Sequence, residues 1–378
     1  MFLAIYCAMD KNTEKIFSFP HMANYHIPIE FLLKLIFKDS KILVPPPTTK
    51  KTLELGSKYS PDFVCVPFKY NLGNYIEALE NGANVLIQAG GGCRFGYYGE
   101  AQEQILKDLG YDFEFIYLVN NAKVNILEMY KKCKEMGSKL SFPIFSYYIL
   151  LTIRMINIMD KIDFYIRENI GFEVQANSFH KLQAEFFNKL KLTTNFKSLH
   201  RTYKEYNERF HNLKINKPNH PLKVGIIGEL YSLMEPFSNY FIEKELAEKN
   251  IVVSRYINVT YLLFQKTRQR KKTIRDANGY LKYAIGADGT DSVAKGIMLA
   301  KKHYDGIIHL KPFGCTPEVN SMPMLQNINK DYKIPILYFS FDSQTSETGV
   351  KTRLEAFYDM ILMRKTKEIF EKDESSYT

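Results

Sequence analysis

Short, continuously apolar runs that alternate with amphipathic stretches constrain the fold of this chain more than any other feature of its sequence. In the first 139 residues, amphipathic segments such as IPIEFLLKLIFKD and EAQEQILKDLG separate runs with the composition of strands. Strands that are apolar on both faces and alternate with helices indicate a parallel sheet covered on both sides. The predicted strands are KIFSFP (15–20), KILVP (41–45), FVCVP (63–67), NVLIQAG (84–90) and FEFIYLV (113–119).

The same alternation returns in the last part of the chain. Between the two halves the strand signals fade, and residues 140–217 have the pattern of successive helices that lead into the linker INKPNHP. We therefore predict an α/β protein with a first lobe at 1–139, a helical insert at 140–217 and a second lobe at 218–378. The predicted strands of the second lobe are LKVGIIG (222–228), IVVSRYINV (251–259), GIIHLKPFG (306–314) and IPILYFSFD (334–342).

Three of the five cysteines occupy the same kind of position in this pattern. Cys65 ends the third predicted strand, Cys93 follows the fourth, and Cys315 follows the third strand of the second lobe. In open α/β sheets, ligands bind at the carboxyl edge of the strands. Free backbone N–H groups and the positive end of the next helix lower the pKa of a thiol there, so we expect thiolates. The other two, Cys7 and Cys133, lie outside the pattern.

The residues around Cys93 fit a binding role at this edge. Gly91 and Gly92 permit backbone angles that are closed to other residues, and they let a bulky group approach closely. Arg94 could hold a carboxylate or phosphate, or stabilise an anionic cluster. We expect Gly91, Gly92 and Arg94 to bind a cofactor.

The residues after Cys315 have the pattern of a helix start. Thr316 offers a capping hydroxyl, Pro317 suits the first helical position, and Glu318 places an acid in the first turn. Cys315 is therefore predicted to lie just ahead of the cap.

Several chemical roles for the three thiols stay open from the residues alone. They could be buried structural cysteines, since free cysteine is often buried. A catalytic cysteine is a second role, although no paired histidine is suggested near any of them. Soft-metal binding is a third: zinc lacks an obvious fourth ligand, whereas a [4Fe-4S] cluster can be held by three thiolates that leave one iron open.

Other polar side chains also follow predicted strands. Glu229 and Asp342 could act on a substrate proton if burial raised their pKa values, and we predict them as catalytic residues. Turn hydrogen bonds and helix caps are the alternative role for each of these side chains. The residues predicted to contact a substrate are His21, Tyr231, Gln344 and Thr345.

Charge and hydropathy limit the partners. The net charge is +10, and the one dense basic run, KTRQRKK at 266–272, indicates an exposed helix end or a phosphate patch. We expect no nucleic-acid partner.

The most apolar run, at 147–153, stops at Arg154 and is far shorter than the roughly 20 residues of a membrane span, so we expect no membrane association. Without a signal-peptide pattern, and with few cysteines, a cytoplasmic protein is expected.

Five segments resemble the 2-hydroxyacyl-CoA dehydratase superfamily, in particular its stand-alone, activase-associated branch. The resemblance covers roughly residues 15–120 and 220–362. The segments are PPPTTKKTLELG, CVPFKYNLGNYIEALENGA, GGGCRFGYYGEAQEQILKDLGYDFEF, HLKPFGCTPEVNSMPMLQ and FDSQTSETGVKTRLEAF.

The resemblance implies two flavodoxin-like lobes with a [4Fe-4S] cluster in the cleft between them, held by Cys65, Cys93 and Cys315. In the dehydratases, a separate ATP-hydrolysing activase delivers one electron, the substrate thioester becomes a ketyl radical, and hydroxide leaves. This chain has no GxxxxGK[ST] motif of its own, and we interpret GADGTDS (286–292) as a turn and helix cap.

The expected function is therefore that of an anaerobic iron–sulfur protein that accepts electrons from an ATP-dependent activase for chemistry on a CoA thioester. Whether it is a lyase, like the dehydratases, stays open, and so does a dimeric state. One alternative is a non-catalytic iron–sulfur electron-transfer or scaffold protein. Another is a cluster-free small-molecule binding protein whose cysteines are merely buried.

Overall fold

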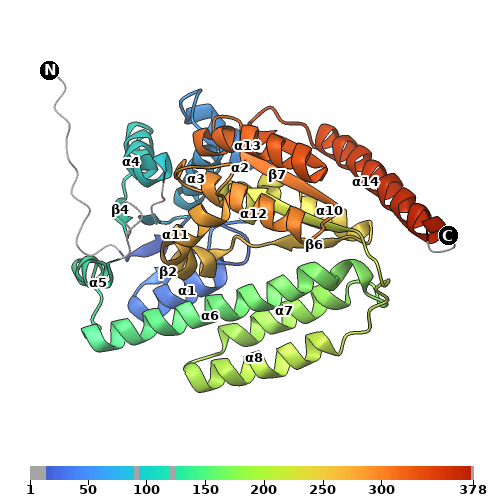
Figure 1. Ribbon diagram of the computed structural model, residues 1–378. Coiled ribbons are helices and arrows are strands. Elements are labelled where there is room, and N and C mark those ends of the chain that lie inside the picture. The colour runs from blue at the N-terminus through green and yellow to red at the C-terminus, as the bar shows by residue number, and fades with distance from the viewer. Residues whose placement is uncertain (1–13, 89–92, 119–124, 376–378) are drawn as a thin grey trace. The chain divides into compact units, whose positions relative to one another are not determined.

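The computed structural model describes residues 14–88, 93–118 and 125–375 (Figure 1). It is an α/β protein with two four-stranded sheets, and every strand pair is parallel. This confirms the predicted class of two Rossmann-like lobes. The chain divides into two compact units: one runs to Val64 and includes Phe68–Thr152, and the other comprises Cys65–Pro67 and the chain from Ile153 on. The predicted domain boundaries at residues 139 and 217 stay predictions.

The sheet of the first unit has the strand order β2-β1-β3-β4. Phe17 on a central strand is fully buried and stacks on Phe37, with 4.1 Å between the ring centroids. Tyr75, also fully buried, packs edge-on against Phe115. All four strands lie within predicted ranges: β1 (Ile16–Ser18), β2 (Lys41–Ile42), β3 (Val85–Gln88) and β4 (Glu114–Tyr117).

The predicted strand at 63–67 is wrong. Helix α3 begins at Val66, inside that segment, and Phe63 is 94% exposed. A proline is tolerated in the first turn of a helix because its missing N–H would have no partner there, so Pro67 does not prevent this start. Cys65 therefore immediately precedes a helix and does not end a strand.

Helices connect the strands of the first unit. Gly110 follows α4 with a φ of +87°, a conformation that favours glycine after the end of a helix. The helices are α1 (His26–Ile36), α2 (Lys50–Tyr59), α3 (Val66–Glu80), α4 (Tyr98–Asp108) and α5 (Ile126–Glu135), with a 3-10 turn at Arg94–Tyr97 before α4.

Helix α6 (Phe142–Asn169) is long, and the division between the two units falls inside it. It continues through Arg154, where the apolar run was expected to stop. The stretch Phe142–Phe172 is apolar and long enough to cross a membrane, although 39% of its most apolar window is buried in the protein. Buried Asp160 on this helix accepts a hydrogen bond from the Thr260 amide at 2.8 Å.

The sheet of the second unit has the order β6-β5-β7-β8. Helices α12 and α13 pack on it, and Ile297 and Leu325 from these helices share a buried cluster with Ile227 and Ile307 from the strands. Each strand lies within its predicted range. Strands β5, β6 and β7 are buried along most of their length, whereas the edge strand β8 is only partly buried: β5 (Lys223–Gly228), β6 (Val252–Arg255), β7 (Gly306–Pro312) and β8 (Ile336–Phe341).

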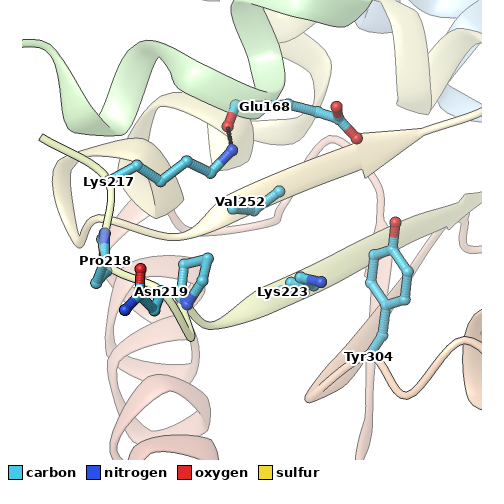
Figure 2. Close-up of a pocket in the computed structure, with 8 residues that line it drawn as sticks. Glu168, Lys217, Pro218, Asn219, Lys223, Val252 and Tyr304 are labelled. Carbon is cyan, nitrogen blue, oxygen red and sulfur yellow. Dashed lines mark hydrogen bonds between the residues drawn. The ribbon is translucent and has the colours of Figure 1, made fainter. Parts of the chain in front are cut away.

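The helices of the second unit include the predicted helical insert. After α8, the linker returns to the end of α6, where the Lys217 ammonium donates to the Glu168 carbonyl at 2.9 Å (Figure 2). The helices are α7 (Ser178–Lys191), α8 (Phe196–His211), α9 (Leu230–Met234), α10 (Ile242–Glu248), α11 (Lys266–Asp276), α12 (Gly289–Lys301), α13 (Thr316–Tyr332) and α14 (Glu347–Ser375). Short turns lie at Ile170–Phe172, Pro236–Asn239 and Tyr261–Gln265, the last a π-helix.

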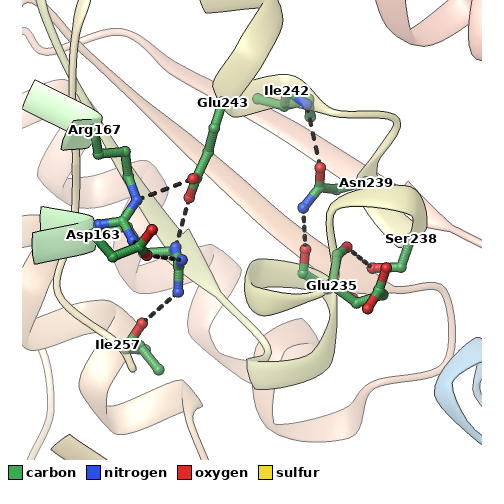
Figure 3. Close-up of polar contacts among 10 residues, drawn as sticks. Asp163, Arg167, Glu235, Ser238, Asn239, Ile242, Glu243 and Ile257 are labelled. Atoms are coloured by element: carbon green, nitrogen blue, oxygen red, sulfur yellow. Dashed lines mark hydrogen bonds and ion pairs between the residues drawn. The ribbon is translucent and has the colours of Figure 1, made fainter. Parts of the chain in front are cut away.

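An ion-pair group of two buried arginines and two partly buried carboxylates ties α6 to the rest of this unit (Figure 3). Glu243 on α10 accepts from Arg167 Nε at 3.0 Å and from Arg255 Nε at 2.6 Å. Asp163, one turn before Arg167 on α6, adds a second carboxylate to both arginines. Burial opposes ionisation of Glu243, but the two arginines outweigh it and lower the pKa of this carboxyl. The carboxylate is therefore charged wherever the unit is folded near neutral pH.

Candidate functional site at the carboxyl edge of the second sheet

The end of strand β5 requires a glycine. Gly228 has a φ of +138°, and a Cβ there would lie 1.8 Å from the Leu310 carbonyl oxygen. This close approach lets the Glu229 amide donate to the same carbonyl at 2.9 Å. The chain turns at this point, and Glu229 is held at the carboxyl edge beside β7.

The Glu229 side chain caps helix α9. It accepts hydrogen bonds of 2.9 Å from the amides of Tyr231 and Ser232 and from the Ser232 hydroxyl. Burial and the negative charge of Asp288 nevertheless raise the pKa of Glu229 to about 7. A carboxyl with this pKa can hold or release a proton near neutral pH, as a general acid or base must. The catalytic role of Glu229 stays a prediction.

A second group of charges beside Glu229 was missed by the sequence interpretation. Asp288, in the segment interpreted as a turn and cap, makes no cap hydrogen bond; its carboxylate accepts from the Leu230 amide at 3.2 Å and pairs with Lys266. Lys266 also pairs with Asp291 at 3.3 Å, and Tyr261 donates to Asp291. The basic run 266–272 gave no sign that its first residue turns inward.

Cys315 lies at the carboxyl end of β7, as predicted, but with two differences. It is itself the cap residue of α13, which starts at Thr316, so the cap is one residue earlier than expected. Its pKa is raised rather than lowered: burial contributes most, then the charge of Glu229, with Glu318 and Cys65 adding to the effect. The Glu318 amide hydrogen bond lowers the pKa but does not compensate. The lowered pKa that we expected for Cys315 is therefore wrong, because burial and neighbouring charge raise it.

Cys65 is grouped with the second unit, where its charge contributes to the raised pKa of Cys315. Both thiols are partly buried. Two of the three predicted ligands thus interact, and Glu229 lies close enough to Cys315 to influence the same thiol. Tyr231, which was predicted to contact a substrate, is buried on α9 next to Glu229.

A fully buried pair lies under Cys315. His309 on β7 and Glu318 on α13 have 2.6 Å between Nε2 and Oε2, and Ser321 donates to the same Glu318 oxygen at 3.2 Å. Glu318 was expected only as an acid in the first helical turn. Its burial and its bond to β7 hold the start of α13, and with it the Cys315 loop, against the sheet. Lys311 is also buried here, and burial lowers its pKa against the attraction of Cys315.

The candidate site residues that follow β8, Asp342, Gln344 and Thr345, form a hydrogen-bonded turn. Asp342 accepts from the Gln344 amide at 2.8 Å and from the Thr345 hydroxyl at 3.0 Å, and its own amide donates to Thr345 at 2.9 Å. Gln344 is exposed. The turn hydrogen bonds match the structural alternative stated for these side chains, while their catalytic and substrate roles stay predictions.

The remaining predicted residues belong to the first unit. Cys93 is exposed and accepts from the Phe95 amide at 3.5 Å, and Arg94 is exposed at the start of the 3-10 turn. His21 is buried; its amide donates to Asn74 and its ring stacks on His26. Gly91 and Gly92 lie outside the described residues, as does Cys7.

The described ranges contain no group of three or more His, Cys, Asp or Glu side chains that could hold a metal ion. Cys65 and Cys315 supply two soft sulfur donors in the second unit, and Cys93 belongs to the first. Cys133, expected to be unrelated to the site, is buried on α5, and burial raises its pKa to about 12.

Part of the chain matches a known protein family. The family model described as 2-hydroxyglutaryl-CoA dehydratase, D-component, matches residues 172–361, which is 190 of the 378 residues. Glu229 and Cys315 lie inside the matched range, whereas Cys65 and Cys93 lie before it. No curated protein gives a significant match to the chain.

Proposed function

The chain belongs to the 2-hydroxyglutaryl-CoA dehydratase D-component family, and we propose that it is an iron–sulfur protein of the CoA-thioester dehydratase type. This membership agrees with the superfamily that the sequence resembles. In the proposal, Cys65, Cys93 and Cys315 hold a [4Fe-4S] cluster that leaves one iron open. When bound, such a cluster supplies one-electron chemistry at low potential.

One observation carries the proposal: the Cys315 thiol lies where Cys65 and Glu229 both act on it. Two neighbouring thiolates at Cys65 and Cys315 would repel each other, and a soft cation relieves that repulsion by binding both. The fully buried His309–Glu318 pair supports this arrangement by holding the Cys315 loop in place. The proposal requires Cys93 to join these two thiols as the third ligand.

The charged groups beside the thiols have roles in the proposed reaction. Glu229, with its pKa of about 7, holds or accepts the proton that accompanies loss of a hydroxyl from the substrate. Lys266 keeps Asp288 and Asp291 paired and so positions the charge that raises the pKa of Glu229. Buried Lys311 provides a positive charge close to Cys315. The proposed substrate is a CoA thioester. The residues proposed to contact it are His21, Tyr231, Gln344 and Thr345.

The electron donor in this proposal is a separate ATP-dependent activase. The sequence has no GxxxxGK[ST] motif through which the chain could bind ATP phosphates in a P-loop. The proposed partner therefore hydrolyses ATP and passes one electron to the cluster, while this chain binds and orients the thioester.

Anaerobic purification followed by iron and sulfide quantification tests the proposal. The wild-type chain is expected to contain about four irons and four sulfides, the composition of one [4Fe-4S] cluster. Cys93→Ser and Cys315→Ser are each expected to lose most of this iron, because serine oxygen is a poor ligand for a soft metal. Cys133→Ser is the matched control, since Cys133 is a buried thiol outside the site.

Two results would contradict the proposal. One is a colourless wild-type protein without iron or sulfide after anaerobic reconstitution. The other is equal iron loss in Cys133→Ser and Cys315→Ser, since a ligand role predicts a difference between them. A protein that keeps its cluster but does not turn over a CoA thioester with the activase would be an electron-transfer protein.

A further inference from the structure

The second unit contains a cavity that none of the candidate site residues lines. It has a volume of about 370 Å³ and lies where the linker after α8 passes the starts of β5 and β6 (Figure 2). Lys223 begins β5, Val252 begins β6, and Tyr304 shortly precedes β7. The cavity therefore lies at the amino edge of the sheet, whereas Glu229 lies at the carboxyl edge, roughly 20 Å from Lys223 along β5 at about 3.3 Å per residue.

Two lysines line this cavity, the half-buried Lys217 and the exposed Lys223. The Lys217 ammonium donates to the Glu168 carbonyl at 2.9 Å and to the Asn169 side chain at 3.2 Å, and it lies 5.3 Å from the centre of the Phe172 ring. Burial lowers the pKa of Lys217, the charge of Glu168 offsets part of this, and Lys223 lowers it further. The two lysines thus repel each other across the cavity.

The carboxylates nearby are already engaged. Glu168, the one acidic side chain of the lining, accepts from the Ser254 hydroxyl at 3.0 Å, and Ser254 in turn accepts from Tyr304 at 2.9 Å. Asp305 does not line the cavity; it pairs with Lys365 at 2.7 Å and accepts from the backbone amide of Lys223. Among the described residues, the Lys223 ammonium makes no ion pair. The cavity therefore has an excess of positive charge.

The rest of the lining suits the uncharged part of a small ligand. Pro218 and Pro221 supply rigid apolar surface, Val252 is a buried apolar residue, and Asn219 adds an amide. The volume falls at the small end of the range of about 300–1,000 Å³ for ligand pockets. A cavity with two cations, a polar rim and apolar walls fits a compact molecule with one oxyanion.

We propose that this cavity binds a small organic oxyanion, a phosphate or carboxylate on a compact apolar body, with its oxygens between Lys217 and Lys223. The proposal does not depend on the function proposed for the carboxyl edge. It assigns the second unit a binding site of its own on the opposite edge of the sheet.

Isothermal titration of the full chain at fixed ionic strength tests this site with three probes: inorganic phosphate, phenyl phosphate and benzoate. Phenyl phosphate is expected to bind more tightly than inorganic phosphate, because its ring can pack on the prolines. If phenyl phosphate binds and benzoate does not, the ligand is a phosphate; the reverse assigns a carboxylate. Saturable binding of either aromatic probe supports the site.

Lysine variants locate the binding. Lys223→Gln, at an exposed side chain that is not needed for folding, is expected to weaken binding about tenfold, the effect of losing one charged hydrogen bond. Lys217→Gln should weaken it at least as much, with its folding checked by circular dichroism. Lys301→Gln, an exposed lysine on α12 outside the cavity, should bind like wild type. Failure of all three probes to bind wild type, or equal affinity of Lys223→Gln and wild type, would overturn the proposal.

Discussion

Gly228 has a backbone conformation that only glycine adopts easily, and this conformation determines where the Glu229 carboxyl lies. The φ of +138° turns the chain at the end of β5, and the absence of a Cβ lets the Leu310 carbonyl approach. The Glu229 amide then bonds that carbonyl while its side chain caps α9. At the residue scale, the candidate site depends on two adjacent residues: Gly228, which has no Cβ and so permits the turn, and Glu229, which supplies the carboxyl.

Gly228→Ala is expected to destabilise the protein by about 3 kcal/mol or more, because it adds steric overlap with a backbone oxygen to an unfavourable φ. The measurement is urea unfolding. Gly279→Ala is the matched control: Gly279 has a φ of +101°, but nothing lies within 4 Å of its added Cβ. It should cost only about 1 kcal/mol, the strain alone. Equal losses would show that the contact with Leu310 is not limiting.

Glu229→Gln removes the titrating group while its amide oxygen can still cap α9. If Glu229 transfers a proton in the proposed reaction, turnover of a CoA thioester should fall about 10²–10⁴-fold, the usual contribution of general acid–base catalysis. Iron content should stay at the wild-type level, since Glu229 is not a predicted ligand. Turnover within a factor of two of wild type would remove Glu229 from the mechanism.

At the scale of elements, ion pairs rather than apolar contacts alone join α6, α10 and β6. Arg167 and Arg255 are both buried, and Glu243 is the carboxylate that both bind (Figure 3). Without the Glu243 carboxylate, the two buried guanidinium groups would share only the Asp163 carboxylate. Removal of one partner from a buried ion pair is costly, because it leaves a buried charge without compensation.

Glu243→Gln is therefore expected to lower the free energy of unfolding by about 3 kcal/mol. Its matched control is Glu248→Gln on the same helix, whose exposed pair with Lys244 spans 3.8 Å and should contribute less than about 1 kcal/mol. Urea unfolding of the three proteins at neutral pH gives the comparison. Losses of similar size in both variants would mean that burial of this ion-pair group contributes nothing.

The lowered pKa of Glu243 predicts part of the pH dependence of the free energy of unfolding. Because the folded-state pKa of Glu243 is lowered, its stabilisation is complete above the unfolded value near 4.3 and is lost as the pH falls through the lower folded value. Wild type should lose stability in this acid range more steeply than Glu243→Gln. Unfolding free energies measured between pH 7 and pH 3 check this, and parallel curves would contradict it.

Elements buried on both faces were predictable from the sequence, whereas long-range pairing of polar groups was not. Strands β5 to β7 lie within their predicted ranges because these largely apolar segments are buried along most of their length, as expected for strands of a parallel sheet covered on both sides. FVCVP was misassigned because its first residue is exposed and its last three begin or precede α3. Lys266 looked like any other member of a basic run. Only the fold brings Asp288 to it from 22 residues away.

The positions of the cysteines illustrate the same limit. Topology placed Cys315 at the end of a strand, but the sign of its pKa shift depends first on burial of the thiol and then on the charge of Glu229, which is remote in sequence. A helix N-terminus alone would have lowered that pKa. Burial and neighbouring negative charge outweigh it, as the local pattern could not reveal.

On the scale of the whole molecule, each unit has its own parallel sheet and its own buried core, while α6 belongs to both. Local stability can then differ between the units even though the chain is continuous. Gly228→Ala should therefore raise the amide exchange rates of β5 and β7 by about the factor that its loss of stability implies, roughly 100-fold for 3 kcal/mol. Protection of β1 and β3 in the first unit should stay unchanged. Hydrogen exchange resolved by peptide measures both at once, and equal loss of protection in the two sheets would show that α6 couples the units into a single cooperative structure.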